Sequence, residues 1–505
     1  MTEEKERARR ERRERTRQDA RLIWRFLRGS RLWFAVCIVS TAGMALADML
    51  SPQIIRMAID NAIGGEPAAY APWIMALVER VGGFERLGRD LWIMALAILA
   101  VALVKVLAQY VSRVSNTRAS ETLVKTMRDT LFTHIERLPF AWHMKNRTGD
   151  IIQRCTSDID TLKNFISEQL TSVFRIVVLL ILSISFMLPM NPWLTLIALV
   201  PMPCIVLYSL RFHRSIGDGF RACDESEGRL SAMAQENLTG VRVVRAFGRE
   251  RYERDRFERH NEEYTGLWVR LAKVMSRFWS TADILSGLQV MLVVVFGAVF
   301  CIGGAMTAGE YVAFISYNSM LVWPVRMLGR MISEMSKAGV SVERIRYIME
   351  SEEETDDPAA PCPPMDGDIA FEHVNFAYDG CPQLLHDITF TMRAGSTLGI
   401  LGGTGSGKST MMLLLDRMYE LPPENGRITV GGVDIRTVRL SYLRKNIGIV
   451  LQEPFLFSRT IEENIGIMQE TPDPDGVREA ARAACLDEAV EGFAKTRYLA
   501  QHLPE

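Results

Sequence analysis

The sequence has almost no net charge, and it lacks any arrangement of cysteines that would bind a metal or build a disulfide framework. Its 59 lysines and arginines balance 60 aspartates and glutamates, so the net charge of −1 gives no reason to expect a nucleic-acid partner. The eight cysteines are scattered and none stands in a C-x-x-C pair, which predicts reduced packing residues. We expect no cleavable signal peptide, because a strongly charged stretch precedes the first apolar run.

What the sequence does contain is a large apolar fraction together with many charges. Hydrophobic residues make up 48% of the 505 positions, yet charged residues still make up 24%. This combination indicates a membrane part joined to a water-soluble part, and the length leaves room for two or three domains.

The first 31 residues are predicted to form a charged cytoplasmic N-terminus and an amphipathic elbow. Residues 1–19 are mostly glutamate and arginine at spacings that allow ion pairs along a solvated helix, and the glutamates argue against a nucleic-acid arm. Leu22, Trp24 and Phe26 then alternate with arginines, a pattern typical of a segment lying on the cytoplasmic membrane face.

Six apolar segments follow, each close to the length that crosses a bilayer. They are approximately Leu32–Leu50, Leu91–Val111, Leu170–Leu188, Trp193–Leu210, Ile284–Ile302 and Tyr311–Val325. The connecting stretches Ser112–Gln169 and Arg211–Asp283 are long, basic and helical in pattern, so the positive-inside rule places them in the cytoplasm with both termini. We expect them to be helices that continue out of the membrane, each with a short turn at its tip.

An acidic, proline-rich linker, Ser351–Asp368, separates these segments from a region of short β-runs and turns. Short β-runs are predicted at Ile369–Phe371 and Val374–Phe376, and alternation predicts a strand at Asp387–Thr391. A further run, Arg427–Val430, ends in a Gly-Gly turn. Two apolar runs, Thr397–Leu401 and Ile447–Leu451, are predicted as buried strands.

A phosphate-binding loop follows the first of these runs. The pattern G-x-x-x-x-G-K-[ST] is met by Gly402, Gly403, Thr404, Gly405, Ser406, Gly407, Lys408 and Ser409, followed by Thr410 and a predicted helix. Such a loop lets backbone amides and a helix N-terminus surround phosphate oxygens. Lys408 is predicted to reach the β- and γ-phosphates of ATP, and the Ser409 hydroxyl to bind Mg²⁺.

This order of parts resembles the ABC exporter half-transporters. The motifs that carry the resemblance are Ser51–Gln53 through Ile59-Asp60, Arg147–Arg154, Glu236–Phe247 and the phosphate loop. The resemblance implies a multidomain fold: an all-α six-helix transmembrane domain with long cytoplasmic helices (32–350), the linker (351–368) and a partial α/β P-loop ATP-binding domain (369–505). It also implies a plasma-membrane protein that works with a second half-transporter, identical or not.

The resemblance assigns further site residues. Tyr378 falls where the family has an aromatic that stacks on adenine, although a core tyrosine at a strand edge is an alternative. Gln452, in Leu451-Gln452-Glu453-Pro454, matches the glutamine that contacts Mg²⁺ or the attacking water, although a plain polar turn is an alternative. Lys408 and Gln452 are thus the implied catalytic residues, and Ser409 and Gln452 the implied metal ligands.

Up to Glu505 the sequence contains no L-S-G-G-Q signature, no carboxylate pair after an apolar strand and no switch histidine of the kind the resemblance implies. We therefore expect a truncated or frame-shifted product. The main hypothesis is ATP-driven export of a small molecule, lipid or peptide. The alternative is a hydrolysis-deficient membrane subunit that only binds nucleotide or a partner.

Three charged residues near the apolar segments are the only indication of the substrate. Asp48, Lys105 and Arg175 would be costly to bury in a membrane, so each is a candidate to face a transport cavity. Snorkelling near the ends of the spans and pairing between helices are the alternatives. A channel or receptor with an attached nucleotide-binding regulator is disfavoured by the two long cytoplasmic stretches.

Overall fold

The computed structural model describes residues 18–19, 21–67, 70, 72–469 and 473–492. The charged helix predicted for residues 1–19 therefore lies almost wholly outside the described residues. The chain divides into two compact units, a first unit of Met1–Glu354 and a second unit of Thr355–Glu505. The division falls within the stretch predicted as a linker.

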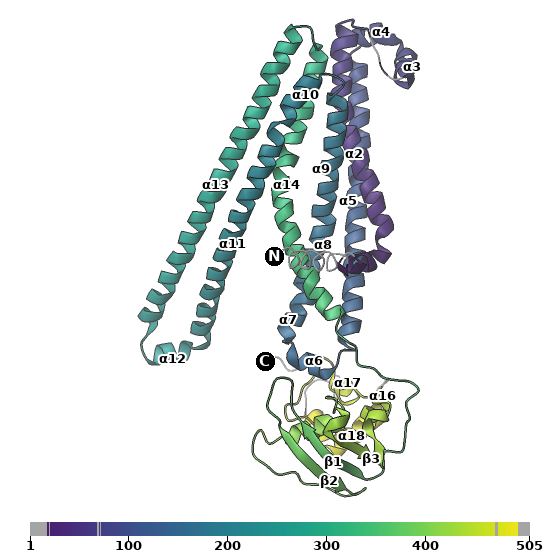
Figure 1. Ribbon diagram of the computed structural model, residues 1–505, viewed down its shortest axis with the longest axis vertical. Coiled ribbons are helices and arrows are strands. Elements are labelled where there is room, and N and C mark those ends of the chain that lie inside the picture. Colours follow the sequence, from purple (N-terminus) through teal and green to yellow (C-terminus); the bar gives the residue numbers. More distant parts are fainter. Residues whose placement is uncertain (1–17, 20, 68–69, 71, 470–472, 493–505) are drawn as a thin grey trace, which may run out of the picture. The chain divides into compact units, whose positions relative to one another are not determined.

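The described part of the first unit is built from helices (Figure 1). In chain order they are η1 (Leu27–Gly29), α2 (Arg31–Met57), η2 (Ala58–Ile63), α3 (Pro72–Val81), α4 (Gly83–Arg89), α5 (Trp92–Ile135), α6 (Phe140–Lys145), α7 (Thr148–Gln153), η3 (Arg154–Asp158), α8 (Ile159–Asn164), η4 (Phe165–Leu170), α9 (Thr171–Met187), α10 (Pro192–Leu199), α11 (Pro201–Thr239), α12 (Val241–Ala246), α13 (Glu250–Ile302) and α14 (Ala308–Met349).

Among the described residues, five continuous helical stretches are long and apolar enough to cross a membrane. They are Arg31–Ile63, Trp92–Ile135, Thr148–Met187, Pro192–Thr239 and Glu250–Ile302, and they contain the first five predicted apolar segments. The sixth predicted segment lies in the 42-residue helix α14, which is not among the five. Its buried face carries the polar Asn318 and the charged Arg326, which lower the hydropathy of this stretch.

Helix α2 is the common packing surface of the first unit, because it lies against α5, α9 and α14. Thr41 Oγ1 shares a hydrogen bond of 2.9 Å with Ser112 Oγ of α5. The fully buried Tyr317 of α14 donates its hydroxyl to the Met49 carbonyl at 2.8 Å and accepts a hydrogen bond from Gln53 Nε2 at 2.9 Å. These contacts satisfy polar groups that would otherwise be stranded among apolar side chains.

The buried carboxylate of Asp60 in η2 forms hydrogen bonds with the start of α14. This carboxylate accepts hydrogen bonds from Thr307 Oγ1 at 2.5 Å and from the Gly309 amide at 2.7 Å, so it caps the N-terminus of α14. Arg56 Nη2 lies 2.6 Å from Glu310 Oε1 and adds an ion pair beside it. We call these five residues the Asp60 joint.

The two basic stretches are helices that extend the spans, as predicted, and short helices form their tips. Helix α6 lies at the tip between α5 and the continuous stretch Thr148–Met187, while α12 lies between the antiparallel α11 and α13 (Figure 1). Leu271 and Phe278 of α13 and Cys223 of α11 are buried between the second pair.

A buried histidine joins the far end of α5 to the chain segment that follows α14. His134 Nδ1 lies 2.7 Å from Glu353 Oε1, and His134 Nε2 lies 2.9 Å from the Ile348 carbonyl oxygen. Trp142 of α6 donates its indole N–H to Ser351 Oγ at 3.0 Å in the same place. Both ring nitrogens of His134 face acceptors, so the ring can donate both bonds only when each nitrogen carries a hydrogen.

The second unit contains a four-stranded antiparallel sheet with strand order β2-β1-β3-β4. Its strands are β1 (Ile369–Phe376), β2 (Leu385–Met392), β3 (Arg427–Val430) and β4 (Val433–Asp434). The predicted runs lie in β1, β2 and β3, so these predictions are confirmed. Phe371, Val374 and Ile428 lie in the core, and register shifts on both sides of Val374 interrupt the alternation along β1. Gly431 and Gly432 turn between β3 and β4 with φ of +57° and +78°.

The remaining elements of the second unit are helices. They are α15 (Lys408–Leu415), η5 (Pro423–Asn425), η6 (Ile435–Thr437), α16 (Leu440–Lys445), α17 (Ile461–Ile465), α18 (Pro474–Ala483) and α19 (Asp487–Glu491).

The prediction of buried strands at Thr397–Leu401 and Ile447–Leu451 is wrong. Neither run is a strand in the structure, and Leu401 and Val450 are 98% and 99% exposed. A buried parallel strand needs hydrogen-bonded neighbours and covered faces, and no strand among the described residues pairs with either run. The phosphate loop is therefore preceded by an irregular segment instead of a strand.

Candidate functional site

The phosphate-loop sequence forms a tight turn that leads directly into α15. Gly405 and Gly407 have φ of +80° and +91°, a region that favours glycine. A Cβ on Gly402 would lie 2.6 Å from Ser406 Oγ, and a Cβ on Gly407 would lie 2.5 Å from Leu385 Cδ2. Gly407 therefore needs glycine for both backbone conformation and space, whereas Gly405 needs it for conformation alone.

The ammonium group of Lys408 lies inside this loop. Its Nζ donates hydrogen bonds to the Gly402 and Gly403 carbonyl oxygens at 2.9 and 2.8 Å, and lies 3.5 Å from Ser406 Oγ. The first amides of α15 have no intrahelical partners and carry the positive end of the helix dipole. Because the Ser409 side chain is exposed, its hydroxyl is open to a cation bound beside a phosphate. A cation and oriented amides on one concave turn fit a phosphate group.

Tyr378 is attached to the first turn of α15. Its hydroxyl shares a hydrogen bond of 2.8 Å with Oγ1 of the buried Thr410. The ring packs edge-on against Phe376 and Tyr419, with centroids 5.0 Å away in each case. The structure thus brings Tyr378 to the phosphate loop as a half-buried side chain, and its stacking on adenine stays a prediction.

Gln452 lies in an exposed, irregular segment after the run Ile447–Leu451. Its role as a metal ligand also stays a prediction. Among the described residues, no group of three or more His, Cys, Asp or Glu side chains could hold a metal ion.

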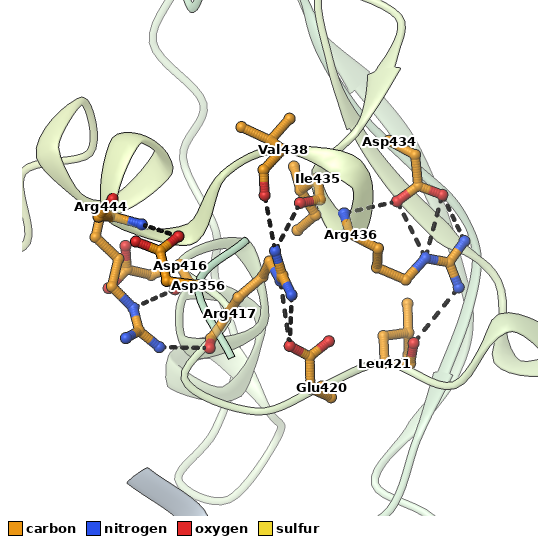
Figure 2. A network of polar contacts seen from close by, with 11 residues as sticks. Asp356, Asp416, Arg417, Glu420, Leu421, Asp434, Ile435, Arg436, Val438 and Arg444 are labelled. Atoms are coloured by element: carbon orange, nitrogen blue, oxygen red, sulfur yellow. Dashed lines mark hydrogen bonds and ion pairs between the residues drawn. The ribbon is translucent and has the colours of Figure 1, made fainter. Parts of the chain in front are cut away.

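The opposite end of α15 is held by a network of arginines that sequence patterns did not single out (Figure 2). Arg417 donates through Nη1 to the Ile435 and Val438 carbonyl oxygens at 3.2 and 3.0 Å, and through Nη2 to Glu420 at 2.7 Å. Arg444 Nη2 donates to the Arg417 carbonyl oxygen at 2.8 Å. This network fixes the helix whose other end carries Lys408.

A bidentate ion pair lies beside this network, between Asp434 and Arg436 (Figure 2). Arg436 Nε and Nη2 both contact the Asp434 carboxylate, with an Nη2–Oδ2 distance of 2.5 Å. Partial burial raises the pKa of Asp434, but the hydrogen bonds and charge of Arg436 outweigh burial and hold this pKa below its usual value.

The structure brings together the three charged residues that the sequence marked in the spans. Lys105 Nζ of α5 lies 2.6 Å from Asp48 Oδ1 of α2, and Arg175 Nη2 of α9 lies 3.9 Å from Asp48 Oδ2. Pairing between helices, one of the alternatives left open, is therefore what the structure contains.

A second charged pair, which sequence reasoning missed, joins α13 to α14. Arg326 Nη1 donates to Asp283 Oδ1 at 2.7 Å, and the guanidinium carbon lies 5.2 Å from the ring centroid of Trp279 and 5.9 Å from that of Trp323. Both charges lie just beyond the predicted spans, so a search inside the apolar segments did not find them.

Two family models match the chain. The family described as "ABC transporter transmembrane region" matches residues 34–325, more than half of the chain. The family described as "ABC transporter" matches residues 385–503, which include the phosphate loop and α15.

Named relatives agree with these matches. The chain is 30% identical over 445 residues to an uncharacterized ABC transporter ATP-binding protein, YknU, of Bacillus subtilis, covering 87% of this chain and 72% of the relative. It is 28% identical over 495 residues to a fatty acid ABC transporter ATP-binding/permease protein of Mycobacterium bovis, covering 93% of this chain and 78% of the relative. It is 30% identical over 456 residues to YheI of B. subtilis, a probable multidrug resistance ABC transporter ATP-binding/permease protein, covering 88% and 73%.

These relatives favour the ATP-driven transporter over the hydrolysis-deficient subunit that the sequence left as an alternative. The helical first unit corresponds to the transmembrane match, and the glycine turn with Lys408 lies in the ATP-binding match. The chain therefore belongs to the ABC transporter family as an exporter half-transporter, a membrane protein in which a helical transmembrane region precedes an ATP-binding domain.

Proposed function

We propose that this chain is one half of a dimeric exporter that moves a small molecule, lipid or peptide across the cytoplasmic membrane when ATP binds and is hydrolysed. The observation that carries the proposal is the glycine turn around Lys408, which fits a phosphate group and follows a set of helices long enough to span a bilayer. The names of two relatives, which refer to fatty acids and to multidrug resistance, support an apolar or amphiphilic substrate.

Each residue of the loop has a proposed task. Lys408 leaves its carbonyl partners and binds the β- and γ-phosphates, while the amides of residues 402–410 surround them. The Ser409 hydroxyl and the Gln452 side-chain oxygen bind Mg²⁺, which neutralises charge on the phosphates. Tyr378 presents its ring to the adenine.

We place the chain in the plasma membrane with both termini in the cytoplasm. The basic stretches that form the two long helical extensions support this orientation, because lysine and arginine are enriched on the cytoplasmic side. An even number of spans also returns the chain to the side where ATP is available. The second half-transporter is either an identical chain or a related one.

The nucleotide site is tested by binding of a fluorescent, non-hydrolysable ATP analogue to the purified chain in lipid nanodiscs. The Lys408→Ala variant removes the cation from the loop, and we expect analogue binding to weaken by about tenfold or more, because a hydrogen bond to a charged group contributes ~1.5–3 kcal/mol. The Lys445→Ala variant removes an exposed lysine of α16 in the same unit and is the matched control. Equal binding by both variants and the wild-type chain would rule out the loop as the phosphate site.

A further inference from the structure

The charged residues of the predicted spans all meet at one place. The six apolar segments together contain one acidic residue, Asp48, and two basic residues, Lys105 and Arg175. These residues come from three different segments, yet both cations lie beside the same carboxylate. Charges in a membrane are costly, so convergence of all three indicates a single polar site.

The charges at this site do not balance. One carboxylate faces an ammonium group at 2.6 Å and a guanidinium group at 3.9 Å, so the site carries one excess positive charge. An arginine keeps its proton in proteins, and the longer distance makes Arg175 the less well compensated cation. An anion would neutralise the excess, and the six apolar segments offer no second carboxylate.

Asp48 and Lys105 lie well inside their helices, and Arg175 is in the first turns of α9, which continues from η4. At 1.5 Å per residue, Lys105 is about 20 Å along α5 from Trp92, and Asp48 is about 22 Å from the end of η2. The hydrocarbon core of a bilayer is about 30 Å thick, and both distances are shorter than that. Lys105 is held at Asp48, which argues against snorkelling to an interface.

The cations are accessible, whereas the carboxylate is shielded. The side chains of Lys105 and Arg175 are 42% and 50% exposed, compared with 12% for Asp48. Exposed apolar side chains adjoin both cations along their helices, among them Val106, Leu107, Val177 and Ile181. A ligand that satisfies this surface needs an anionic headgroup and an apolar tail.

We propose that Asp48, Lys105 and Arg175 form a binding site for the headgroup of an anionic amphiphile, with Lys105 and Arg175 contacting the anion and Asp48 positioning the two cations. The proposal rests on the exporter function and names the substrate class of that function. The anion is either the carboxylate of a single-chain amphiphile or the phosphate of an anionic phospholipid.

The test compares two probes of equal chain length, hexadecanoate and hexadecanol, by equilibrium binding to the full chain in neutral phosphatidylcholine nanodiscs without nucleotide. We expect the wild-type chain to bind hexadecanoate roughly 10- to 100-fold more tightly than hexadecanol, the range for a hydrogen bond between charged groups. The Lys105→Met and Arg175→Met variants should each lose most of this preference. Lys105→Arg, which keeps the charge, should retain it.

Two further variants separate a binding role from a structural one. Asp48→Asn keeps an acceptor oxygen that can position the two cations but removes the competing negative charge, so it should raise the preference for hexadecanoate, whereas a purely structural role predicts a loss. Lys125→Met removes a lysine of the same helix about 30 Å further along and should leave the preference unchanged. Hexadecanol binding in every variant reports whether the protein is folded.

A wild-type chain that binds the two probes equally, or a preference that survives in the Lys105→Met/Arg175→Met double variant, would overturn the proposal. Competition by phosphatidylglycerol identifies the anion as a phospholipid headgroup, and lack of competition identifies a single-chain carboxylate. Binding of the ATP analogue is measured in the same preparation, so that the proposal for the nucleotide site and the proposal for the anion site are tested separately. If the wild-type chain fails to bind the analogue but still prefers hexadecanoate, only the nucleotide site is contradicted.

Discussion

At the scale of single residues, the ion pair between Asp434 and Arg436 depends on the charge of the carboxylate, so its contribution to stability can be tested by changing the pH. Because Arg436 holds the pKa of Asp434 below its usual value, the ionised carboxylate stabilises the folded state above the unfolded pKa of about 3.9. This contribution is lost as the pH falls through the lower, folded pKa. We expect Asp434→Asn to destabilise the chain by about 1 kcal/mol at neutral pH and by much less in the acidic range below pH 4.

Thermal unfolding of the detergent-solubilised chain, followed by intrinsic fluorescence between pH 7 and pH 3, measures this difference. Asp475→Asn is the control, because this side chain is 94% exposed and its ion pair is 3.9 Å long. A destabilisation by Asp434→Asn that stays constant down to pH 3 would contradict the assignment.

The sequence predicted residues of the candidate site only where their pattern is confined to neighbouring positions. The glycine spacing from Gly402 to Gly407 and the following lysine identified the loop, because its chemistry is contained in one turn. The His134–Glu353 contact spans 219 positions and the Gly309–Asp60 contact spans 249, so no local pattern could reveal them. Asp48, Lys105 and Arg175 were found individually, but their convergence depends on packing among three helices.

At the scale of elements, the Asp60 joint makes a prediction about α14. A Cβ on Gly309 would lie 2.6 Å from Asp60 Oδ2 and 2.7 Å from the Arg56 carbonyl oxygen. We therefore expect Gly309→Ala to separate η2 from α14 and to cost about 1–3 kcal/mol, the usual range for overpacking.

The control for this substitution is on the same helix. A Cβ on Gly339 meets no atom within 4 Å, so Gly339→Ala should leave the chain equally or slightly more stable, because alanine favours helices over glycine. Both variants are compared by thermal unfolding in the same detergent. If Gly309→Ala proves as stable as Gly339→Ala, the close contact with Asp60 does not exist in solution.

The strands show why elements differ in how well a sequence predicts them. Strand β1 pairs antiparallel with both β2 and β3, and each of these strands could be recognised from its local sequence. The runs Thr397–Leu401 and Ile447–Leu451 have equally apolar sequences, but a run of this type becomes a buried strand only when neighbouring strands and covering helices are present. Composition alone could not supply that information.

At the scale of the whole molecule, the second unit exposes apolar surface that can be tested by substitution. Val450 is 99% exposed, so Val450→Thr should change the free energy of unfolding by less than about 0.5 kcal/mol and lower the binding of the dye ANS. Val430 of β3 is only 3% exposed, and Val430→Thr should cost about 1–3 kcal/mol because it buries a hydroxyl group.

The same two valine variants also define the result that would contradict this prediction. If Val450→Thr destabilises the chain as much as Val430→Thr, then residues 447–451 are covered in solution. Unfolding by urea, measured together with ANS fluorescence for both variants, decides between the two results.

The lengths of α11 and α13 have a mechanical consequence. About 33 residues of α13 lie between Glu250 and Asp283, where Arg326 of α14 holds the helix, and this stretch is about 50 Å long. A tilt of about 5° at that attachment point would displace the α12 tip by about 4 Å, close to the distance between neighbouring strands in a sheet. The length of the α11–α13 pair therefore converts a small rotation at that attachment point into a displacement of the α12 tip of about the size of one side chain.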